Sequence, residues 1–313
     1  MAGRFTTMNS MFGAMCLGLS ATVVAACGPT SPTSDTPTVA VALFPLEEIA
    51  RRVGGSSISV VSLTPTGVDA HSTELTAKQL DALEDSDLVL YVGDDFQPSI
   101  EGAIRTLDSS VATIDFLDHV DLIDASADHE SADHEHGAHD PHVWLDPRNM
   151  QEMVRVVSTA IEALVGDADA ASVRSNAQDY IEELGVLDDE MNTGLTECGT
   201  RTLVTSHDAF GYLASRYSLT TMSVTGLNPD EDPSARQLED LADAARNAGV
   251  RTIFFEAMLP RDLADTVART IGASTDILNP IEGISTSDKS AGATYASMQR
   301  DNLRRLRIGL RCA

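Results

Sequence analysis

The sequence predicts an α/β protein of two halves, each a parallel sheet flanked by helices, joined by one long helix. Strand-like and helix-like segments alternate between residues 38 and 117 and again between 202 and 279. Between the two halves, apolar residues recur at alternating steps of three and four, the spacing of a long amphipathic helix. The 313 residues are 42% hydrophobic, a globular composition with enough apolar material for two cores.

The first half, expected over residues 38–166, contains four strand candidates, and two helical patterns separate the first three of them. The strand candidates are apolar segments rich in β-branched residues: 38–43, 58–63, 88–93 and 111–117. The helical patterns are 45–55, which two glycines end, and 76–85. Strands that alternate with helices in this way pair in parallel, with helices over both faces of the sheet.

The second half, expected over residues 198–313, repeats this order. Its strand candidates are 202–206, 221–226, 252–257 and 276–279. Its helices are expected at 208–217, at 234–249 and from Pro260 onward. In the middle one, Leu238, Leu241, Ala242 and Ala245 form one apolar face.

A single long helix is expected between the halves, from about residue 167 to 197. At ~1.5 Å per residue it would be roughly 45 Å long, enough to span both halves. The alternative is an ordinary amphipathic helix that packs on one half; the length and central position favour a rigid spine. The residues of its apolar stripe are Val173, Ala177, Tyr180, Leu184, Leu187, Met191 and Leu195.

The N-terminus is typical of an export signal. After Arg4, the run from Met11 to Ala26 has no charge and is too short to span a membrane. Small residues before Cys27 resemble the bacterial lipoprotein signal, in which the cysteine is lipidated; a plain signal peptide cleaved elsewhere is the alternative. We therefore expect a signal over residues 1–26, a flexible tether over 27–37, and a protein anchored through lipid to the outer face of the cytoplasmic membrane.

Four cysteines fit an exported protein. Cys16 leaves with the signal and Cys27 is the expected lipid site, so Cys198 and Cys312 remain. In an oxidising compartment these two predict one disulfide, which would stabilise the fold by roughly 4–5 kcal/mol on the chain-entropy model. Two unrelated thiols are the alternative.

The charge excludes several functions. The formal net charge of -27, from 21 Lys and Arg against 48 Asp and Glu, argues against nucleic acids and against charge-driven adhesion to anionic lipid. The two lysines, Lys78 and Lys289, do not follow a glycine. The chain therefore has no GxxxxGK loop, and an ATPase or GTPase of that class is excluded.

The histidines are the candidate metal ligands of the chain. His71 lies between a predicted strand and a helix, and His207 follows the predicted strand at 202–206 and opens a helix. His142 lies in DPHVWLDP, two residues before the single tryptophan of the chain. The first two in sequence belong to the first half and His207 to the second. Because α/β folds bind ligands at the carboxyl ends of parallel strands, we expect the three to converge between the halves. Imidazole suits Zn, Cu, Ni and Fe. Taken singly, each has a plainer interpretation as a surface or hydrogen-bonding group, and His119 is assigned to structure.

The remaining histidines crowd into the acidic segment 128–139, DHESADHEHGAH: His129, His134, His136 and His139. The segment has no hydrophobic periodicity. We expect it to collect metal ions weakly near the main site; a solvated acidic insertion that happens to contain histidine is the alternative.

Four motifs carry a resemblance to a known family: GVDAHSTEL (67–75), DPHVWLDP (140–147), VTSHDAFGYLASRY (204–217) and ILNPIEG (277–283). The chain resembles the metal-binding subunits of bacterial ABC importers for zinc and manganese, and the zinc branch most. The resemblance implies two pseudo-symmetric lobes that hold one metal in the cleft between them, with the long helix restricting their motion. It also implies His71, His142 and His207 as ligands, and a His rather than a Glu at 207 favours Zn over Mn.

The fourth ligand departs from the family pattern. Many members have an Asp late in the second lobe, which aligns here with Asn279 in ILNPIEG. Three outcomes are open: Asn279 binds weakly, Glu282 reaches the metal, or water completes the tetrahedron.

The resemblance implies an exported, monomeric zinc receptor, not an enzyme, that delivers Zn(II) to an integral-membrane ABC permease served by a separate cytoplasmic ATPase. A manganese-binding member of the family is the first alternative. A zinc hydrolase would use Glu256 or Glu282 as general base, but the chain has neither HExxH nor GxSxG. A lipid-anchored adhesin that keeps the metal only for structure is the third.

Overall fold

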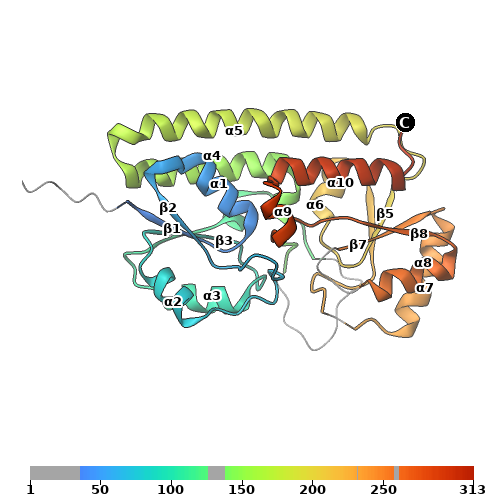
Figure 1. Ribbon diagram of the computed structural model, residues 1–313. Coiled ribbons are helices and arrows are strands. Elements are labelled where there is room, and N and C mark those ends of the chain that lie inside the picture. Colours follow the sequence, from blue (N-terminus) through green and yellow to red (C-terminus); the bar gives the residue numbers. More distant parts are fainter. Residues whose placement is uncertain (1–35, 126–137, 231, 257–260) are drawn as a thin grey trace, which may run out of the picture. The chain divides into compact units, whose positions relative to one another are not determined.

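Two four-stranded parallel sheets form the centres of two lobes in the computed structural model of the protein (Figure 1). The structure describes residues 36–125, 138–230, 232–256 and 261–313. The strand order is β2-β1-β3-β4 in the first sheet and β6-β5-β7-β8 in the second, so the second lobe repeats the topology of the first. The predicted fold class is confirmed.

The eight strands are each four residues long. The first sheet consists of β1 (Thr38–Val41), β2 (Ser59–Ser62), β3 (Leu88–Tyr91) and β4 (Ala112–Asp115). The second consists of β5 (Thr202–Thr205), β6 (Thr220–Ser223), β7 (Thr252–Phe255) and β8 (Ser274–Ile277). All pairings are parallel, and each predicted strand contains or overlaps one of these.

Helices surround both sheets. Those before the long helix are α1 (Phe44–Gly54), α2 (Ala77–Glu84), α3 (Pro98–Ile104) and α4 (Pro147–Val165). Those after it are α6 (Gly211–Arg216), α7 (Ala235–Asn247), α8 (Asp262–Ile271), α9 (Thr286–Ser290) and α10 (Tyr295–Gly309). Helices α3, α4, α9 and α10 were not predicted from the sequence, and α6 begins at Gly211, three residues after the predicted start at Asp208.

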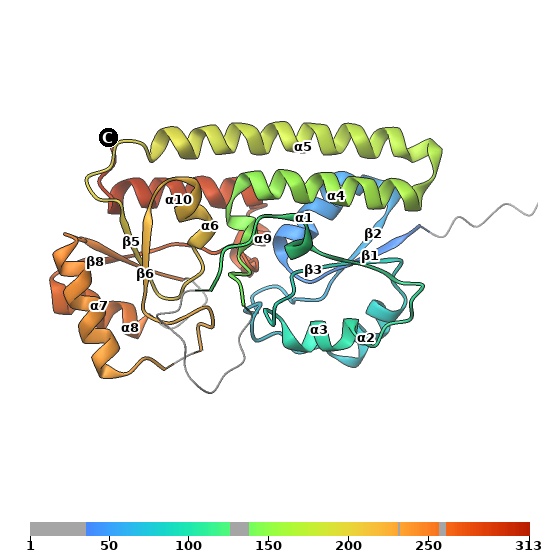
Figure 2. The ribbon, with the colours of Figure 1, turned by 180° about the vertical axis from the view of Figure 1, so that it is seen from behind.

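The long helix α5 (Asp167–Gly194) runs along both lobes (Figures 1 and 2). Every residue of its predicted apolar stripe is buried, which fixes this face against the rest of the protein. Near its start Asn176 donates to the carbonyl of Val53 in α1 at 3.1 Å, and near its end Glu190 pairs with Arg300 in α10 at 2.6 Å. The helix therefore spans the lobes as predicted, although it ends at Gly194.

A glycine makes the reversal before this helix possible. Gly166 separates α4 from α5 and has a φ of 73°, a backbone conformation that other residues rarely adopt. The two helices then pack side by side over most of their length, so α5 rests on α4 in the first lobe (Figure 2).

The apolar interior has two parts. The larger core is continuous from the first sheet through α4 and α5 to α6 and α10. A separate, smaller core lies in the second lobe between the sheet and the helices α7 and α8. Its buried members are Val204, Val224, Ala242, Ala245, Val250, Ile253, Ala264, Val267 and Ala268.

The disulfide between Cys198 and Cys312 is present, and it ties the chain just after α5 to the C-terminus. The predicted signal, Cys27 and all but two residues of the tether lie outside the described residues. Within the described ranges, none of the helices combines the length and the apolar character needed to cross a bilayer.

One buried carboxylate connects the long helix to both lobes. Asp188 of α5 accepts hydrogen bonds from Arg148 of α4 at 3.1 Å, from Arg216 of α6 at 3.0 Å and from the Tyr217 hydroxyl at 3.1 Å. Burial alone would raise the pKa of Asp188, but the two arginines lower it below its usual value.

We expect D188N to destabilise the metal-free protein by about 2 kcal/mol at pH 7, because two arginines lose their carboxylate partner. A lowered carboxyl pKa stabilises the fold above the unfolded pKa of about 3.9, and this contribution is lost as the pH falls through the folded value. Urea unfolding at pH 7 and pH 3 should therefore show a difference between wild type and D188N that shrinks in acid.

The matched control is E190Q on the same helix. Glu190 and Arg300 form an exposed pair, with 40% and 42% of their side chains exposed, so their loss should cost less than about 1 kcal/mol. Equal stabilities for D188N and E190Q would contradict the connecting role of Asp188.

Candidate metal centre

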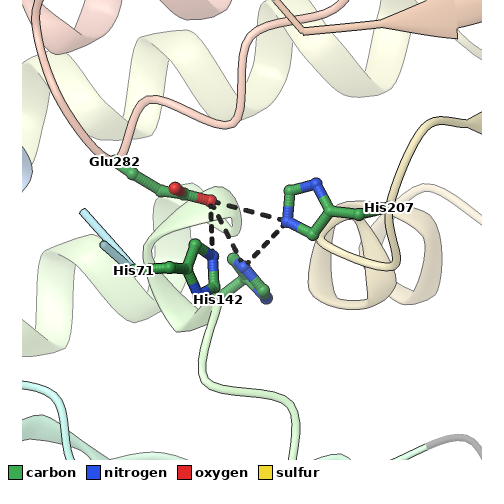
Figure 3. A group of neighbouring side chains, drawn as sticks. All are labelled: His71, His142, His207 and Glu282. Carbon is green, nitrogen blue, oxygen red and sulfur yellow. Dashed lines mark hydrogen bonds and ion pairs between the residues drawn. The ribbon is translucent and has the colours of Figure 1, made fainter. Parts of the chain in front are cut away.

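Four side chains from four separate loops converge between the lobes (Figure 3). His71 lies in the loop between β2 and α2, and His142 immediately precedes a 3-10 helix over residues 143–145. His207 follows β5 by two residues, and Glu282 follows β8 by five. His142, His207 and Glu282 are at most 1% exposed. The carboxyl ends of the strands thus bring the group together.

The spacing of the four donor atoms matches a small tetrahedral ion. Oε1 of Glu282 lies 3.5 Å from Nε2 of His71, 3.3 Å from Nε2 of His142 and 3.7 Å from Nε2 of His207. The Nε2 atoms of His142 and His207 are 3.3 Å apart. A tetrahedron with Zn–ligand bonds of 2.0–2.1 Å has edges of about 3.3–3.4 Å. These four distances are therefore close to the edges of a tetrahedral zinc site, and all four donor atoms lie within 4.8 Å of one another.

Several of these donor atoms lack other partners. Among the described residues, Nε2 of His71 and both carboxylate oxygens of Glu282 are buried without a hydrogen bond. A buried carboxylate whose oxygens accept no hydrogen bond is costly, and a cation bound between these atoms would lower that cost.

Two further carboxylates orient two of the imidazoles. Asp140 contacts Nδ1 of His142 at 2.8 Å, and Glu256 contacts Nδ1 of His207. The hydroxyl of Ser206 also donates to Glu256, at 2.7 Å. An imidazole that donates from Nδ1 presents the lone pair of Nε2 to the centre, as in the carboxylate–histidine pairs of zinc sites.

The same carboxylates hold protons on the imidazoles when no metal is bound. Burial would lower the pKa of His142, but Asp140 and Glu282 raise it to about 10. Burial likewise opposes protonation of His207, yet Glu256 and Glu282 raise its pKa above the usual value. The pKa of Glu282, which burial would raise, is held well below its usual value by His71 and His142. A metal ion entering this site must displace protons.

An aromatic shell encloses the first-lobe side of the site. The ring of Phe96 lies 4.5 Å from that of His71 and 5.3 Å from that of Trp144, which is itself 5.3 Å from the ring of His142. Phe96 is 3% exposed and Trp144 is fully buried, so this side excludes water.

The structure brings together the three predicted histidines, and Glu282 is the fourth member of the group. Asn279 instead accepts a hydrogen bond from the backbone N–H of Ile281 at 2.8 Å. Glu256, a candidate general base, lies behind His207 rather than among the donor atoms. Asp140 was missed, although its position two residues before His142 was a usable signal. The ligand roles themselves stay predictions.

The other histidines lie elsewhere. His119 ends a 3-10 helix of the first lobe that begins at Phe116. His129, His134 and His136 of the histidine-rich segment lie outside the described residues. His139 is described, and its backbone N–H donates to Asp94 at 2.6 Å.

Comparisons with known proteins agree with this geometry. The "zinc-binding lipoprotein AdcA" of Streptococcus pneumoniae is 32% identical over 271 residues, which cover 84% of this chain and 54% of the relative. The "high-affinity zinc uptake system protein ZnuA" of Bacillus subtilis is 30% identical, over 92% of this chain and 94% of its own. The chain thus spans about half the length of the streptococcal relative and nearly all of the Bacillus one.

A solved structure and a family model indicate the same family as these two relatives. The crystal structure of the Zn(II)-bound ZnuA-like domain of Streptococcus pneumoniae AdcA matches with a TM-score of 0.74 at 29% identity, covering 88% of this chain and 99% of that one. Residues 39–309 match the family model described as zinc-uptake complex component A, periplasmic. The chain therefore belongs to the ZnuA family of zinc-uptake components.

Proposed function

We propose that this protein is an extracytoplasmic zinc receptor that binds one Zn(II) between its lobes and delivers it to an ABC import permease. The observation that carries the proposal is the group of His71, His142, His207 and Glu282, whose donor atoms have the spacing of a tetrahedral zinc site. Membership of the family and the zinc-binding names of its relatives support the same cargo.

Zinc is favoured over manganese by the donor set. Three imidazole nitrogens and one carboxylate suit Zn(II), whereas Mn(II) is better served by oxygen-rich sites with more ligands. The aromatic shell of Phe96 and Trp144 leaves the first-lobe side of the site closed to additional water ligands.

We infer binding rather than catalysis from the same donors. A catalytic zinc keeps one position open for water, whereas four side chains are available here to fill a tetrahedron. Glu256, which a hydrolase would need as a base, is already hydrogen-bonded to His207 and Ser206.

The partners and location follow from the proposed role. The permease and its ATPase would be separate chains, and the receptor would act as a monomer held at the outer face of the membrane through lipid on Cys27. The lipoprotein name of the streptococcal relative supports this anchoring. We further propose that the segment 128–139 collects zinc near the cleft.

H142A should lower zinc affinity by on the order of 100-fold or more, because it removes one ligand from the tetrahedron. Competitive titration of residues 28–313, purified free of metal, with elemental analysis of the loaded form, measures this. Wild type should bind one zinc tightly and prefer it to manganese. H119A is the control, since His119 lies outside the group; equal affinities for wild type and H142A would refute the site.

Zinc binding should release about one proton or more per ion at pH 7.5, because His142 with a pKa of about 10 is protonated in the metal-free protein. Because protons compete with zinc for His142, zinc affinity should rise as the pH increases from 6 toward 9. Calorimetry in buffers of different ionisation enthalpy counts the protons. Binding without proton release would contradict the charge state inferred for the empty site.

Replacing His129, His134 and His136 with serine should slow zinc loading at scarce zinc and leave the affinity of the main site nearly unchanged. Stopped-flow loading at sub-stoichiometric zinc, combined with the competitive titration above, separates the two effects. Loss of the tight site in this variant would contradict the collecting role.

A further inference from the structure

Glu282 belongs to the second lobe in sequence, but its backbone segment is bonded to the first lobe. Three alternate carbonyls of residues 280–284 accept hydrogen bonds from first-lobe donors. Pro280 accepts from the indole N–H of Trp144 at 2.7 Å, Glu282 from the N–H of Phe44 at 3.1 Å, and Ile284 from the N–H of Gly67 at 2.9 Å. The segment that carries Glu282 is thus held in place by the first lobe.

The backbone of this segment has an unusual conformation. Ile281, which precedes Glu282, has a φ of 60°, a value that β-branched residues rarely adopt. Such a conformation persists where surrounding contacts fix it. Asn302 of α10 adds a contact at the start of the segment, where it bonds both the N–H and the carbonyl of Asn279.

His207 is held differently. Its ring is bonded to Glu256 and its carbonyl to the hydroxyl of Thr205 at 2.8 Å, and both partners belong to the second lobe. Both of these hydrogen bonds therefore stay within the lobe of His207. The first lobe therefore holds three of the four donor side chains, and the second lobe holds His207.

Trp144 is the only side chain among the three first-lobe donors. It is fully buried, with its ring against His142 and Phe96, and its carbonyl accepts from the hydroxyl of Tyr295 at 2.6 Å. It therefore contacts one proposed ligand, His142, through its ring and fixes the segment of another, Glu282, through its N–H.

We propose that Trp144 is a positioning residue for zinc capture: its indole N–H holds Glu282 beside His71 and His142, so that the first lobe presents three ligands as one unit and His207 completes the site. The inference rests on the proposed function, since it assigns a role within the same site. Partners of this kind typically contribute 10–100-fold to metal affinity.

The test removes the N–H of Trp144 and measures zinc affinity by competition with a chromophoric chelator. W144F should bind zinc about tenfold more weakly than wild type. Replacement of this single tryptophan by 3-benzothienylalanine, which has sulfur in place of the N–H but keeps the fused ring, should give a similar loss. This second variant preserves the packing on His142 and covers the case in which W144F folds poorly.

A double-mutant cycle assigns the effect to Glu282. In an E282Q background, removing the N–H should change affinity by less than about twofold, whereas in an H207A background the tenfold loss should persist. Y180F is the control: it removes a buried hydroxyl donor to Glu48 on the long helix, and zinc affinity should be unchanged.

The outcomes are distinct. Wild-type affinity in both Trp144 variants would overturn the positioning role, and so would an undiminished loss in the E282Q background, which would place the effect on His142 or on folding. Absence of tight zinc binding in the wild type would instead refute the proposed function, and the same titration would show it before any Trp144 variant is made.

Discussion

The structure depends on one unfavourable group, a buried carboxylate among three imidazoles. Glu282 is 1% exposed and neither of its oxygens accepts a hydrogen bond within the described residues. Without a cation, protons on the histidines must balance this charge, and the raised pKa values of His142 and His207 express that balance. In the proposed receptor, a zinc ion would replace these protons with direct bonds.

The repeated topology explains how such a group can be assembled. Each of the four donor side chains lies in a connection that follows the carboxyl end of a strand, in one of two sheets with the same strand order. Neither lobe contains all four donors, so the site exists only while the lobes keep their relative position. The continuous core along α5, together with Asp188 and its arginine partners from both lobes, holds that position.

The sequence predicts much of the fold and of the site, and the parts that it does not predict have physical explanations. The alternating strands, the stripe on α5 and the three histidines are local signals. The position of Glu282, rather than Asn279, among the donor atoms instead depends on a positive φ at Ile281 and on contacts with Trp144 and Phe44. Helices α3 and α9, of 7 and 5 residues, are too short to show a period, while α10 is mostly polar. The apolar face of α4, a helix of 19 residues, could have been predicted from the sequence.

Three of the four donor side chains are held by the first lobe and one, His207, is held by the second. Ala209 and Phe210, which follow His207, belong to the large core that joins α5 to both lobes. In the proposed receptor, loss of the His207 bond alone would leave the ion on the other three donors. A zinc ion left with three donors has an open coordination position, as in catalytic zinc sites, and can exchange ligands there. In the proposed receptor, the asymmetry that preorganises binding would therefore also provide a route for handing the ion on.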